Sequence, residues 1–344
     1  MHLKYLAYTL LKTDFKKVNQ LVNLLHQEKK TPKRLIYKDL VTHLFKWNTH
    51  FIDYFYNQFF DDAVDKTKYA SVWDMYLFHK KYNRKERMIF RDKLLFKKRF
   101  SNYSAYPYFE LNSEMDFSPL YTWIKDNNYQ KIVAKKPLAS SGKGVKILKL
   151  DFVSNKLLID GRQFESYINT LYKMGFTLFE SYIEQHSCLK QIYPGSINTI
   201  RIVTFVNGSK EVEVWGTTIR MGVNKSVDNF SMGGISANID INSGIINTKA
   251  RYKSPFQCEY DIHPVTGENI TGVEIPYWAE TIETIKKAAL EVPEVRTIGW
   301  DIAITPQGPT LIEGNDNWNK TNFELVTGIG LNNRIKALLK QHEV

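Results

Sequence analysis

Two acidic residues and one asparagine near the carboxyl end of the chain have the chemistry of a metal site. Asp301 opens one predicted strand and Glu313 closes the next. A hairpin of these two strands returns both carboxylates to neighbouring positions, and Asn315 adds a neutral oxygen on the same side. An all-oxygen set of this kind suits Mg²⁺, which combines carboxylates with phosphate oxygens and water. Either acid alone would more often be an ordinary polar residue at a strand end.

A pair of lysines ends a short apolar run and precedes a loop of small residues. After Lys135 and Lys136, residues 139–144 read Ala-Ser-Ser-Gly-Lys-Gly, and a second strand begins there. Backbone N–H groups of such a loop can approach phosphate oxygens because few side chains intervene, and lysines neutralise the phosphate charge. The pattern is not a P-loop, since no G-x-x-x-x-G-K-[ST] occurs and a strand follows. A plain hairpin turn is the alternative.

Two arginines lie in apolar runs that alternate like strands. Arg201 is flanked by Ile200 and Ile202, and Arg220 ends a second run. Because side chains alternate between the two faces of a strand, each arginine points away from the apolar face, toward a cleft if the sheet lines one. Guanidinium groups match phosphate or carboxylate oxygens. For either arginine alone, a surface salt bridge is the alternative.

A polar segment follows the apolar run at residues 177–183. The backbone of such a run could carry an adenine, while Glu180 or Glu184 accepts a hydrogen bond from the base or the ribose. By itself this segment is a weak signal of nucleotide binding.

The elements that must position these residues change in type along the chain. In residues 1–110, apolar residues repeat at three and four positions, which is helix spacing. The periodicity stops in residues 103–119, which we predict to be a connector. Short strands and helices follow without regular βαβ order, which predicts an α+β fold with mostly antiparallel pairing.

The predicted strands are residues 131–136, 142–150, 177–183, 200–206, 212–220, 297–304 and 310–313. The predicted helices are residues 164–174, 278–290 and 332–341. Asn207-Gly208 and Gln307-Gly308 are the predicted hairpin turns.

The net charge is concentrated in the first part of the chain. Residues 1–100 hold 22 Lys and Arg against 10 Asp and Glu, whereas the whole chain has 47 and 36. Such a surplus marks a surface for anionic lipid or an acidic polymer, or else a solvated basic helical face. No run of about 18 apolar residues is free of charge, which excludes a membrane span. With two cysteines and no signal peptide, a protein of a reducing compartment is expected.

In their order along the chain, these motifs resemble the ATP-grasp superfamily of carboxylate–amine ligases. The series begins with the lysine-proline strand end and the small-residue loop. It continues with the strand leading to Gln185-His186 and the segment Asn198-Thr199-Ile200-Arg201. The series ends with Gly233-Gly234, the turn at His263-Pro264 and the hairpin that carries Asp301 and Glu313. Over residues 88–340 the order is similar to the branch associated with sugar transfer and surface polysaccharides.

The resemblance implies a role in ATP binding for each matching residue. Lys136 resembles the strand lysine that contacts phosphates, with Lys135 as the alternative one position away. Lys93, in Arg91-Asp92-Lys93-Leu94, resembles a helix-start lysine with a further phosphate contact. The residues that correspond to the loop over the phosphates are Ser140, Ser141, Gly142, Lys143 and Gly144. Those that correspond to the adenine-binding linker are Glu180, Tyr182 and Ile183, with Glu184 as a ribose partner.

The resemblance also implies the metal and catalytic residues. The expected magnesium ligands are Asp301, Glu313 and Asn315. Arg201 and Arg220 are similar to the arginines that steady the γ-phosphate and the acyl-phosphate. The implied cofactors are ATP and two Mg²⁺ ions, for which Mn²⁺ could substitute.

The implied function is amide formation through an acyl-phosphate, which attaches an amino acid or amine to a uronic acid in capsular polysaccharide biosynthesis. Alternatives are an ATP-dependent phosphotransferase on the same fold, and a non-catalytic nucleotide-binding protein whose basic region contacts nucleic acid or a membrane. For the ligase we expect a cytoplasmic protein that contacts an anionic polymer or the inner membrane face, without nucleic acid. The implied domains are a basic helical region at 1–110 and an ATP-grasp domain at 111–344, divided into a lid at 130–182 and a metal and substrate subdomain at 183–344.

Overall fold

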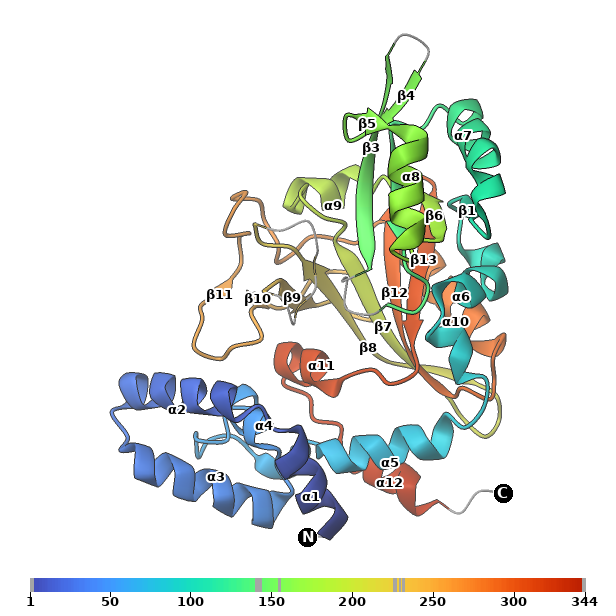
Figure 1. The fold of residues 1–344 in the computed structure, drawn as a ribbon. Helices are drawn as coiled ribbons and strands as arrows, with labels where there is room; N and C mark the ends of the chain where they lie inside the picture. The colour runs from blue at the N-terminus through green and yellow to red at the C-terminus, as the bar shows by residue number, and fades with distance from the viewer. Residues whose placement is uncertain are drawn as a thin grey trace.

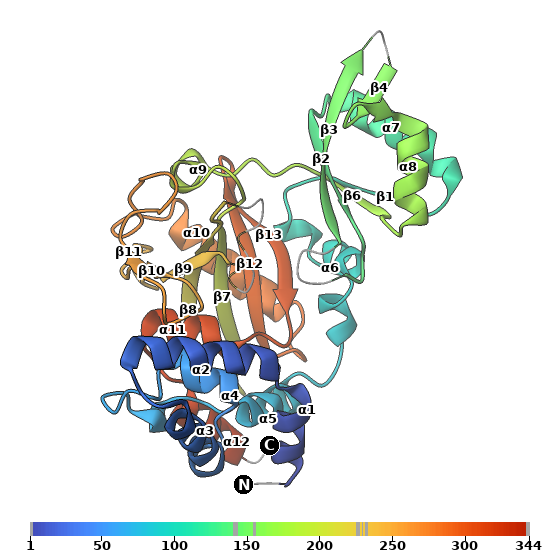
Figure 2. The same cartoon turned by 60° about the vertical axis from the view of Figure 1, so that its left-hand side comes forward.

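The computed structural model describes residues 3–139, 144–153, 156–224, 228, 230 and 233–341. The first part of the chain forms short helices, and α1 to α5 lie together at the lower end of the molecule (Figures 1 and 2). These elements are α1 (Leu3–Lys12), α2 (Phe15–Lys29), α3 (Lys33–Trp47), α4 (Phe51–Tyr56), η1 (Lys66–Lys68), α5 (Val72–Tyr82), η2 (Arg87–Phe90), α6 (Lys93–Arg99) and η3 (Ser101–Tyr103). Val22, Leu25, Ile36 and Phe55 are buried in the core that α1 to α4 share. The predicted helical character of this part is confirmed.

A first sheet follows, with the strand order β1-β6-β2-β3-β4-β5 and antiparallel pairing throughout. Its strands are β1 (Tyr108–Glu110), β2 (Lys131–Lys135), β3 (Val145–Val153), β4 (Lys156–Ile159), β5 (Arg162–Gln163) and β6 (Leu178–Ser181). The helical elements of this part are η4 (Glu114–Asp116), α7 (Phe117–Asp126) and α8 (Phe164–Lys173). Ile132, Ala134 and Leu148 are fully buried in one core with Ile124 of α7 and Ile168 of α8. The helices therefore cover one face of this sheet and leave the other for the rest of the molecule (Figure 2).

The second sheet has the strand order β11-β10-β9-β8-β7-β12-β13 and is also antiparallel. Its strands are β7 (Thr199–Val206), β8 (Val212–Met221), β9 (Ile235–Asn238), β10 (Ala250–Arg251), β11 (Glu259–Tyr260), β12 (Thr297–Thr305) and β13 (Gly308–Asn315). The accompanying helices are α9 (Ser187–Ile192), α10 (Trp278–Leu290), α11 (Lys320–Thr327) and α12 (Asn332–Lys340). Ile285 of α10 packs in one buried core with Ile200, Ile298 and Trp300. The opposite face of the central strands remains available for polar side chains.

The N-terminal helices are joined to the second sheet by apolar and charged contacts. The ring of Phe78 on α5 stacks on Trp215 of β8, with 5.3 Å between ring centroids. Lys320 of α11 places its Nζ 2.6 Å from Glu324 Oε2 and 3.6 Å from Asp53 Oδ2 of α4. These three charged groups are largely buried, so the N-terminal helices and the second sheet share a buried ion cluster as well as a core.

The predicted α+β class with antiparallel pairing is confirmed, and most predicted elements are present. Residues 103–119 are the main difference, because this predicted connector contains β1 and the start of α7. Ser113 and Asp116 form a capping box that starts this helical segment, and Pro119 lies in the first turn of α7, where proline is tolerated. No helix within the described ranges combines the length and the apolar composition needed to cross a membrane.

The β7–β8 hairpin has the predicted strands but a different turn. Its left-handed residue is Lys210, with φ 62°, and not Gly208. The Oδ1 atom of Asn207 accepts hydrogen bonds from the backbone N–H groups of Ser209 and Glu211, each at 2.9 Å. This side chain closes a longer loop than a two-residue turn.

Candidate active site

Two adjoining pockets lie where the open faces of the sheets meet. The inter-sheet pocket has a volume of about 240 Å³ and is lined by Val133, Lys135, Ile147, Glu180, Thr199 and Asp301, among others. The outer pocket has a volume of about 590 Å³ and is lined by Arg91, Arg201, Asn315, Asn319, Asn322 and Lys253, among others. Lys93, Arg220, Ile312 and Glu313 line both pockets. The two pockets therefore meet at a charged boundary.

Asp301 and Glu313 are directly opposite each other in the β12–β13 ladder. The register shifts between Asp301 and Ile302: Ile302 pairs with Leu311, so Ile312 is an extra residue on β13. Without this bulge, alternation from the turn would place Glu313 opposite Trp300, on the core face. The bulge thus turns both Ile312 and Glu313 toward the pockets, and Asn315 lies on the same face two residues later. The sequence prediction that the two carboxylates are neighbours is confirmed.

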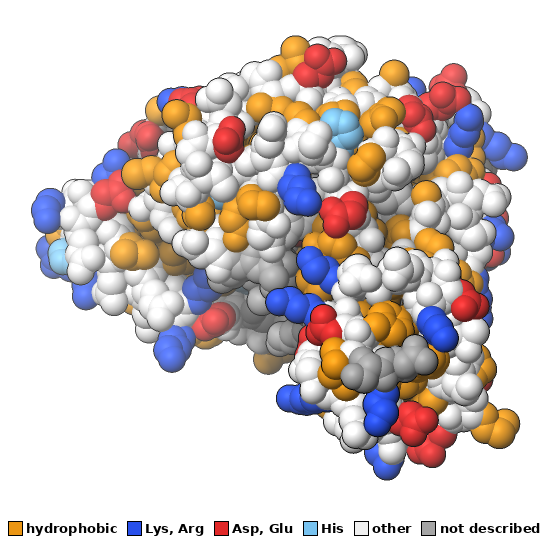
Figure 3. All heavy atoms as spheres, turned by 90° about the horizontal axis from the view of Figure 1, so that it is seen from above, with side chains coloured by type: hydrophobic (Ala, Val, Ile, Leu, Met, Phe, Trp, Pro, Cys, Tyr) orange, Lys and Arg blue, Asp and Glu red, His pale blue; other side chains and the backbone are white. Residues whose placement is uncertain are grey.

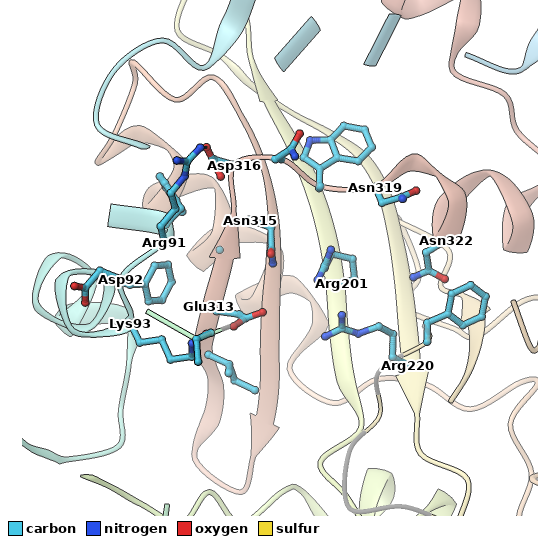
Figure 4. Close-up of a pocket in the computed structure, with 18 of the residues that line it drawn as sticks. Arg91, Asp92, Lys93, Arg201, Arg220, Glu313, Asn315, Asp316, Asn319 and Asn322 are labelled. Atoms are coloured by element: carbon cyan, nitrogen blue, oxygen red, sulfur yellow. The ribbon is translucent and has the colours of Figure 1, made fainter. Parts of the chain in front are cut away.

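Asp301 forms an ion cluster with the two strand arginines. Arg201 is the ladder partner of Asp301 on β7, and Arg220 projects from the same face of β8. Arg201 donates to Asp301 through Nε and through Nη2, the latter at 2.8 Å from Oδ2, and Arg220 Nη2 lies 2.9 Å from Oδ2. Figure 4 shows both guanidinium groups in the cavity, across from Glu313 and Lys93.

The charges of this cluster shift the pKa values of its carboxyl groups in opposite directions. Burial opposes ionisation of Asp301, but the positive charges of Arg201 and Arg220 outweigh it and lower the pKa of Asp301 to about 2. Burial and the adjacent charge of Asp301 raise the pKa of Glu313. Two carboxyl groups this close favour a cation beside them, and with the oxygen of Asn315 they fit the donor set of a magnesium ion. No group of three or more His, Cys, Asp or Glu side chains in the described part of the chain has a metal-binding arrangement.

Basic side chains from the first sheet and α6 form the opposite wall. Lys135 Nζ lies 2.5 Å from Glu180 Oε2, and Lys97 Nζ lies 3.9 Å from Glu180 Oε1. Lys97 also donates to Ser104 Oγ at 2.9 Å, and burial lowers the pKa of Lys97 to about 7. A buried carboxylate therefore lies between two lysines beside the inter-sheet pocket.

Lys93 is held at the boundary of the two pockets by the start of α6. Asp92 caps this helix, because its Oδ1 accepts from the backbone N–H groups of Leu94 and Leu95. Gly314 permits the close approach of η2 and α6 to β13, since a Cβ atom there would lie 2.7 Å from Cδ1 of Phe90 on η2 and 3.1 Å from Cε2 of Phe96 on α6. The ammonium of Lys93 donates to the Ala139 carbonyl, which places it beside the predicted phosphate loop.

The structure places Lys135, and not Lys136, at the inter-sheet pocket. Val133 and Lys135 are on one face of β2, whereas Ala134 is on the helix-covered face. Lys136 follows the strand, and its Nζ lies over the ring of Phe176, 5.0 Å from the centroid. Of the two lysines considered for the phosphate contact, Lys135 is therefore the one that lines the pocket.

The other predicted nucleotide residues are only partly brought together. Glu180, Tyr182 and Ile183 line the inter-sheet pocket. Glu184 is exposed and pairs with Lys190 at 3.3 Å, outside that pocket. Gly144 precedes β3, whereas Ser140, Ser141, Gly142 and Lys143 lie outside the described residues.

Some residues of the site are not identified by the sequence analysis. Lys97 follows Lys93 by four positions, so helix periodicity is a signal that could have found it. Asp228 accepts a hydrogen bond from the Thr199 backbone N–H at 2.9 Å and lies 3.8 Å from Arg220 Nε. Asn319, Asn322 and Lys253 line the outer pocket from segments without any motif.

A family model described as sugar-transfer associated ATP-grasp matches residues 75–340. A comparison with curated proteins found no significant match. Three similar solved structures are a biotin carboxylase–β,γ-ATP complex from Campylobacter jejuni, the biotin carboxylase domain of Hydrogenobacter thermophilus 2-oxoglutarate carboxylase, and the D-alanine-D-alanine ligase from Coxiella burnetii. In that order, sequence identities are 12%, 14% and 11%, and TM-scores are 0.47, 0.44 and 0.41. The matches cover 75%, 75% and 73% of this chain, and 47%, 47% and 57% of the solved chains, which is about half their length.

Proposed function

The chain belongs to the sugar-transfer associated ATP-grasp family, and on this premise we propose that it is an ATP- and Mg²⁺-dependent carboxylate–amine ligase. The observation that carries the proposal is the charged boundary of the two pockets. There the adjacent carboxyl groups of Asp301 and Glu313 meet the cations Lys93, Arg201 and Arg220. Such a boundary suits a phosphoryl group that passes from a nucleotide on one side to an acceptor on the other.

ATP binds in the inter-sheet pocket in this proposal. The apolar side chains of Val133 and Ile147 provide a surface for the adenine, next to the backbone of Tyr182 and Ile183. Lys135 and Lys93 then contact the phosphates, together with the loop that contains Ser140 to Gly144. Residues 130–182, which contain the strands β2 to β6 of the first sheet, serve as a lid over the metal and substrate subdomain at residues 183–344. The basic region at residues 1–110 precedes this ATP-grasp domain.

Asp301, Glu313 and Asn315 are the residues that would hold magnesium. Two Mg²⁺ ions, which Mn²⁺ could replace, would neutralise the charge of the β- and γ-phosphate oxygens. The pairing of Asp301 with Arg201 and Arg220 keeps this carboxylate ionised, because the arginines hold its pKa at about 2. Asp301 is therefore ionised at neutral pH and could bind a magnesium ion without first losing a proton.

The proposed reaction has two steps. A carboxylate oxygen of the acceptor attacks the γ-phosphorus of ATP, the bond to the β,γ-bridging oxygen breaks, and ADP leaves. An amine nitrogen then attacks the acyl carbon, inorganic phosphate leaves, and the amine loses a proton to give the amide. The N–H groups of Arg201 and Arg220 that do not contact Asp301 can bind the oxygens of the transferring group. Charge stabilisation and positioning dominate, since the first nucleophile is already ionised.

We propose a sugar carboxylate such as a uronic acid as the acceptor, in surface polysaccharide biosynthesis, with an amino acid or other amine as the second substrate. The outer pocket is the acceptor site, because it adjoins the inter-sheet pocket and is lined by neutral amides as well as cations. We place the enzyme in the cytoplasm, at the inner face of the membrane. The exposed side chains on α3 support this contact, because Tyr37, Val41 and Phe45 alternate there with Arg34 and Lys38.

The experiment that tests the ligase is ADP release from Mg-ATP by the purified protein with a panel of uronic acids crossed with amino acids. Turnover that requires both an acid and an amine, with the amide detected by mass spectrometry, supports the proposal. Turnover with an acceptor alone and no amide favours phosphoryl transfer to a hydroxyl group, for which the same site would serve. If ATP does not bind, the protein is not an ATP-grasp ligase.

A further inference from the structure

The outer pocket extends from the charged boundary toward the N-terminal helices. Phe230, which lines it, packs in a buried cluster with Tyr56 of α4 and Leu325 of α11. Lys253 also lines it, and its Nζ lies over the ring of Tyr56, 5.1 Å from the centroid. The two side chains that line this end of the pocket are therefore backed by Tyr56 of the N-terminal helices.

The other cations that line the outer pocket already have partners. Arg201 and Arg220 contact Asp301, Lys93 donates to the Ala139 carbonyl, and Arg91 Nη2 lies 3.9 Å from Asp316 Oδ2. Each of these contacts fixes its side chain on the protein. Each of these four cations thus has a polar partner on the protein before a substrate enters.

Lys253 differs from these cations, because within the described ranges its ammonium makes neither a hydrogen bond nor an ion pair with a protein oxygen, and its contact is the ring of Tyr56. The negative group that acts on it is Asp53, which itself pairs with the buried Lys320. Burial lowers the pKa of Lys253, and Asp53 opposes this shift only in part. A half-buried ammonium that faces a cavity and has lost part of its hydration gains most from an anion in that cavity.

We propose that Lys253 binds a second anionic group of the acceptor, a phosphate or a further carboxylate, while the reacting carboxylate lies beside Arg220. The inference rests on the proposed function and narrows its substrate to an acidic sugar with two separate negative charges. A lysine ammonium is a suitable point charge for phosphate. Asn319 and Asn322 line the same pocket, and the amide groups not used by the Thr321 N–H to Asn319 Oδ1 and Asn322 Nδ2 to Thr218 Oγ1 hydrogen bonds can bond to sugar hydroxyls.

The test is calorimetric titration of the full chain with three probes, in the presence and absence of Mg-AMP-PNP. The probes are glucuronic acid 1-phosphate, methyl glucuronide and inorganic phosphate. We expect the sugar phosphate to bind about tenfold more tightly than methyl glucuronide, the gain of one charge-assisted hydrogen bond. In Lys253→Met this preference disappears and the affinity for methyl glucuronide is unchanged, whereas Lys253→Arg keeps most of the preference.

Lys249→Met is the matched control. Lys249 lies four positions earlier in the same segment, is exposed, and pairs with Asp261 at 2.9 Å, so its loss should change neither affinity. Equal affinities for the two sugars, or an unchanged preference in Lys253→Met, overturn the inference. Inorganic phosphate binding as tightly as the sugar phosphate also overturns it, because the site would then be one for free phosphate.

Failure of the inference and failure of the proposed function give different results. If AMP-PNP binds but neither sugar does, the acceptor class is wrong and the nucleotide site stands. If AMP-PNP does not bind, the ligase proposal fails, and the titrations without nucleotide still decide whether Lys253 selects the sugar phosphate.

Discussion

Asp301 and Glu313 share one face of the β12–β13 hairpin because Ile312 forms a bulge between them and the turn. The bulge makes two consecutive residues of β13 face the pockets, and it sets two carboxyl groups side by side against the arginines of β7 and β8. The arrangement is electrostatically unequal, since both guanidinium groups contact Asp301 while the pKa of Glu313 is raised. Glu313 is therefore the carboxyl group with more to gain from a bound cation.

Replacing Glu313 by Gln should reduce Mg-dependent ADP release by about 10²–10³-fold, as for loss of a preorganised electrostatic contact. The substitution conserves size and removes a buried carboxyl group, so the melting temperature should not fall. Glu283→Gln, on the exposed face of α10, is the control and should leave ADP release unchanged. Full activity of Glu313→Gln would exclude Glu313 from the metal site.

The chain offers a matched pair in Lys135 and Lys136. Lys135→Met should raise the KM for ATP at least tenfold, because a lysine that faces the inter-sheet pocket and can contact phosphate is lost. Lys136→Met should change this KM less than twofold, since Lys136 lies over Phe176 on the other side of the sheet. Initial rates at varied ATP concentration compare them. A larger effect at Lys136 would contradict the observed register.

Lys97 should make the stability of the protein depend on pH between about 7 and 10.5. Burial lowers its pKa from 10.5 to about 7 in the folded state, so in this range the unfolded chain binds one more proton than the folded protein. The free energy of unfolding contributed by this group therefore rises with pH across the window.

Chemical denaturation of the wild type and of Lys97→Met at pH 7, 8 and 9 measures this difference. We expect the wild type to gain stability relative to the variant at each step upward. A constant difference between the two proteins over these pH values would mean that Lys97 stays charged in the fold.

The ion cluster of Lys320, Glu324 and Asp53 predicts a large effect on stability. Lys320→Met leaves two buried carboxylates without their shared cation, which should cost about 3–5 kcal/mol of unfolding free energy. Lys287→Met is the control, because it removes a lysine from an exposed pair with Glu283 on α10. Urea denaturation compares the two. Similar small losses would show that the cluster does not hold the N-terminal helices in place.

The exposed side chains of α3 predict binding to anionic vesicles. The protein should sediment with vesicles that contain phosphatidylglycerol and not with pure phosphatidylcholine. Val41→Ser with Phe45→Ser should reduce sedimentation several-fold, whereas Leu290→Ser on α10, also exposed, should not. Sedimentation that is equal for the two lipids would argue against an electrostatic membrane contact.

The sequence predicts the second sheet well and the first sheet less completely. Long alternating strands such as β7, β8 and β12 have a clear period of two, and their apolar faces locate the two arginines and Asp301 on the other face. Glu313 reaches that face only through the bulge at Ile312, which alternation does not predict. The strands β1, β4 and β5 are too short for such a pattern. Lys135 and Lys136 are adjacent, so an error of one position exchanges their places relative to the pocket. Alternation from the buried Ala134 assigns Lys135 to the pocket face of β2, but only once it is known which face of the sheet the helices cover.

Tertiary packing accounts for the residues that the sequence does not reveal. Lys97 could be found from its spacing to Lys93, but its burial depends on Tyr108 of β1 and on Glu180 of β6, and β6 is remote in sequence. Lys253, Asn319 and Asn322 reach the outer pocket because α11 and the segment after β10 pack on the N-terminal helices. No local pattern encodes that contact. On the face seen in Figure 3, acidic and basic side chains are interspersed.

Side chains at the far end of the outer pocket are backed by residues that lie outside the match to the family. Tyr56 and Asp53 precede residue 75, where the match to the family begins, yet they lie beside the lysine at the far end of this pocket. With the proposed acceptor role of Lys253, residues outside the matched range would therefore influence acceptor binding. A chimera that exchanges this segment between two relatives should exchange acceptor preference, provided that the partners of α11 are exchanged with it.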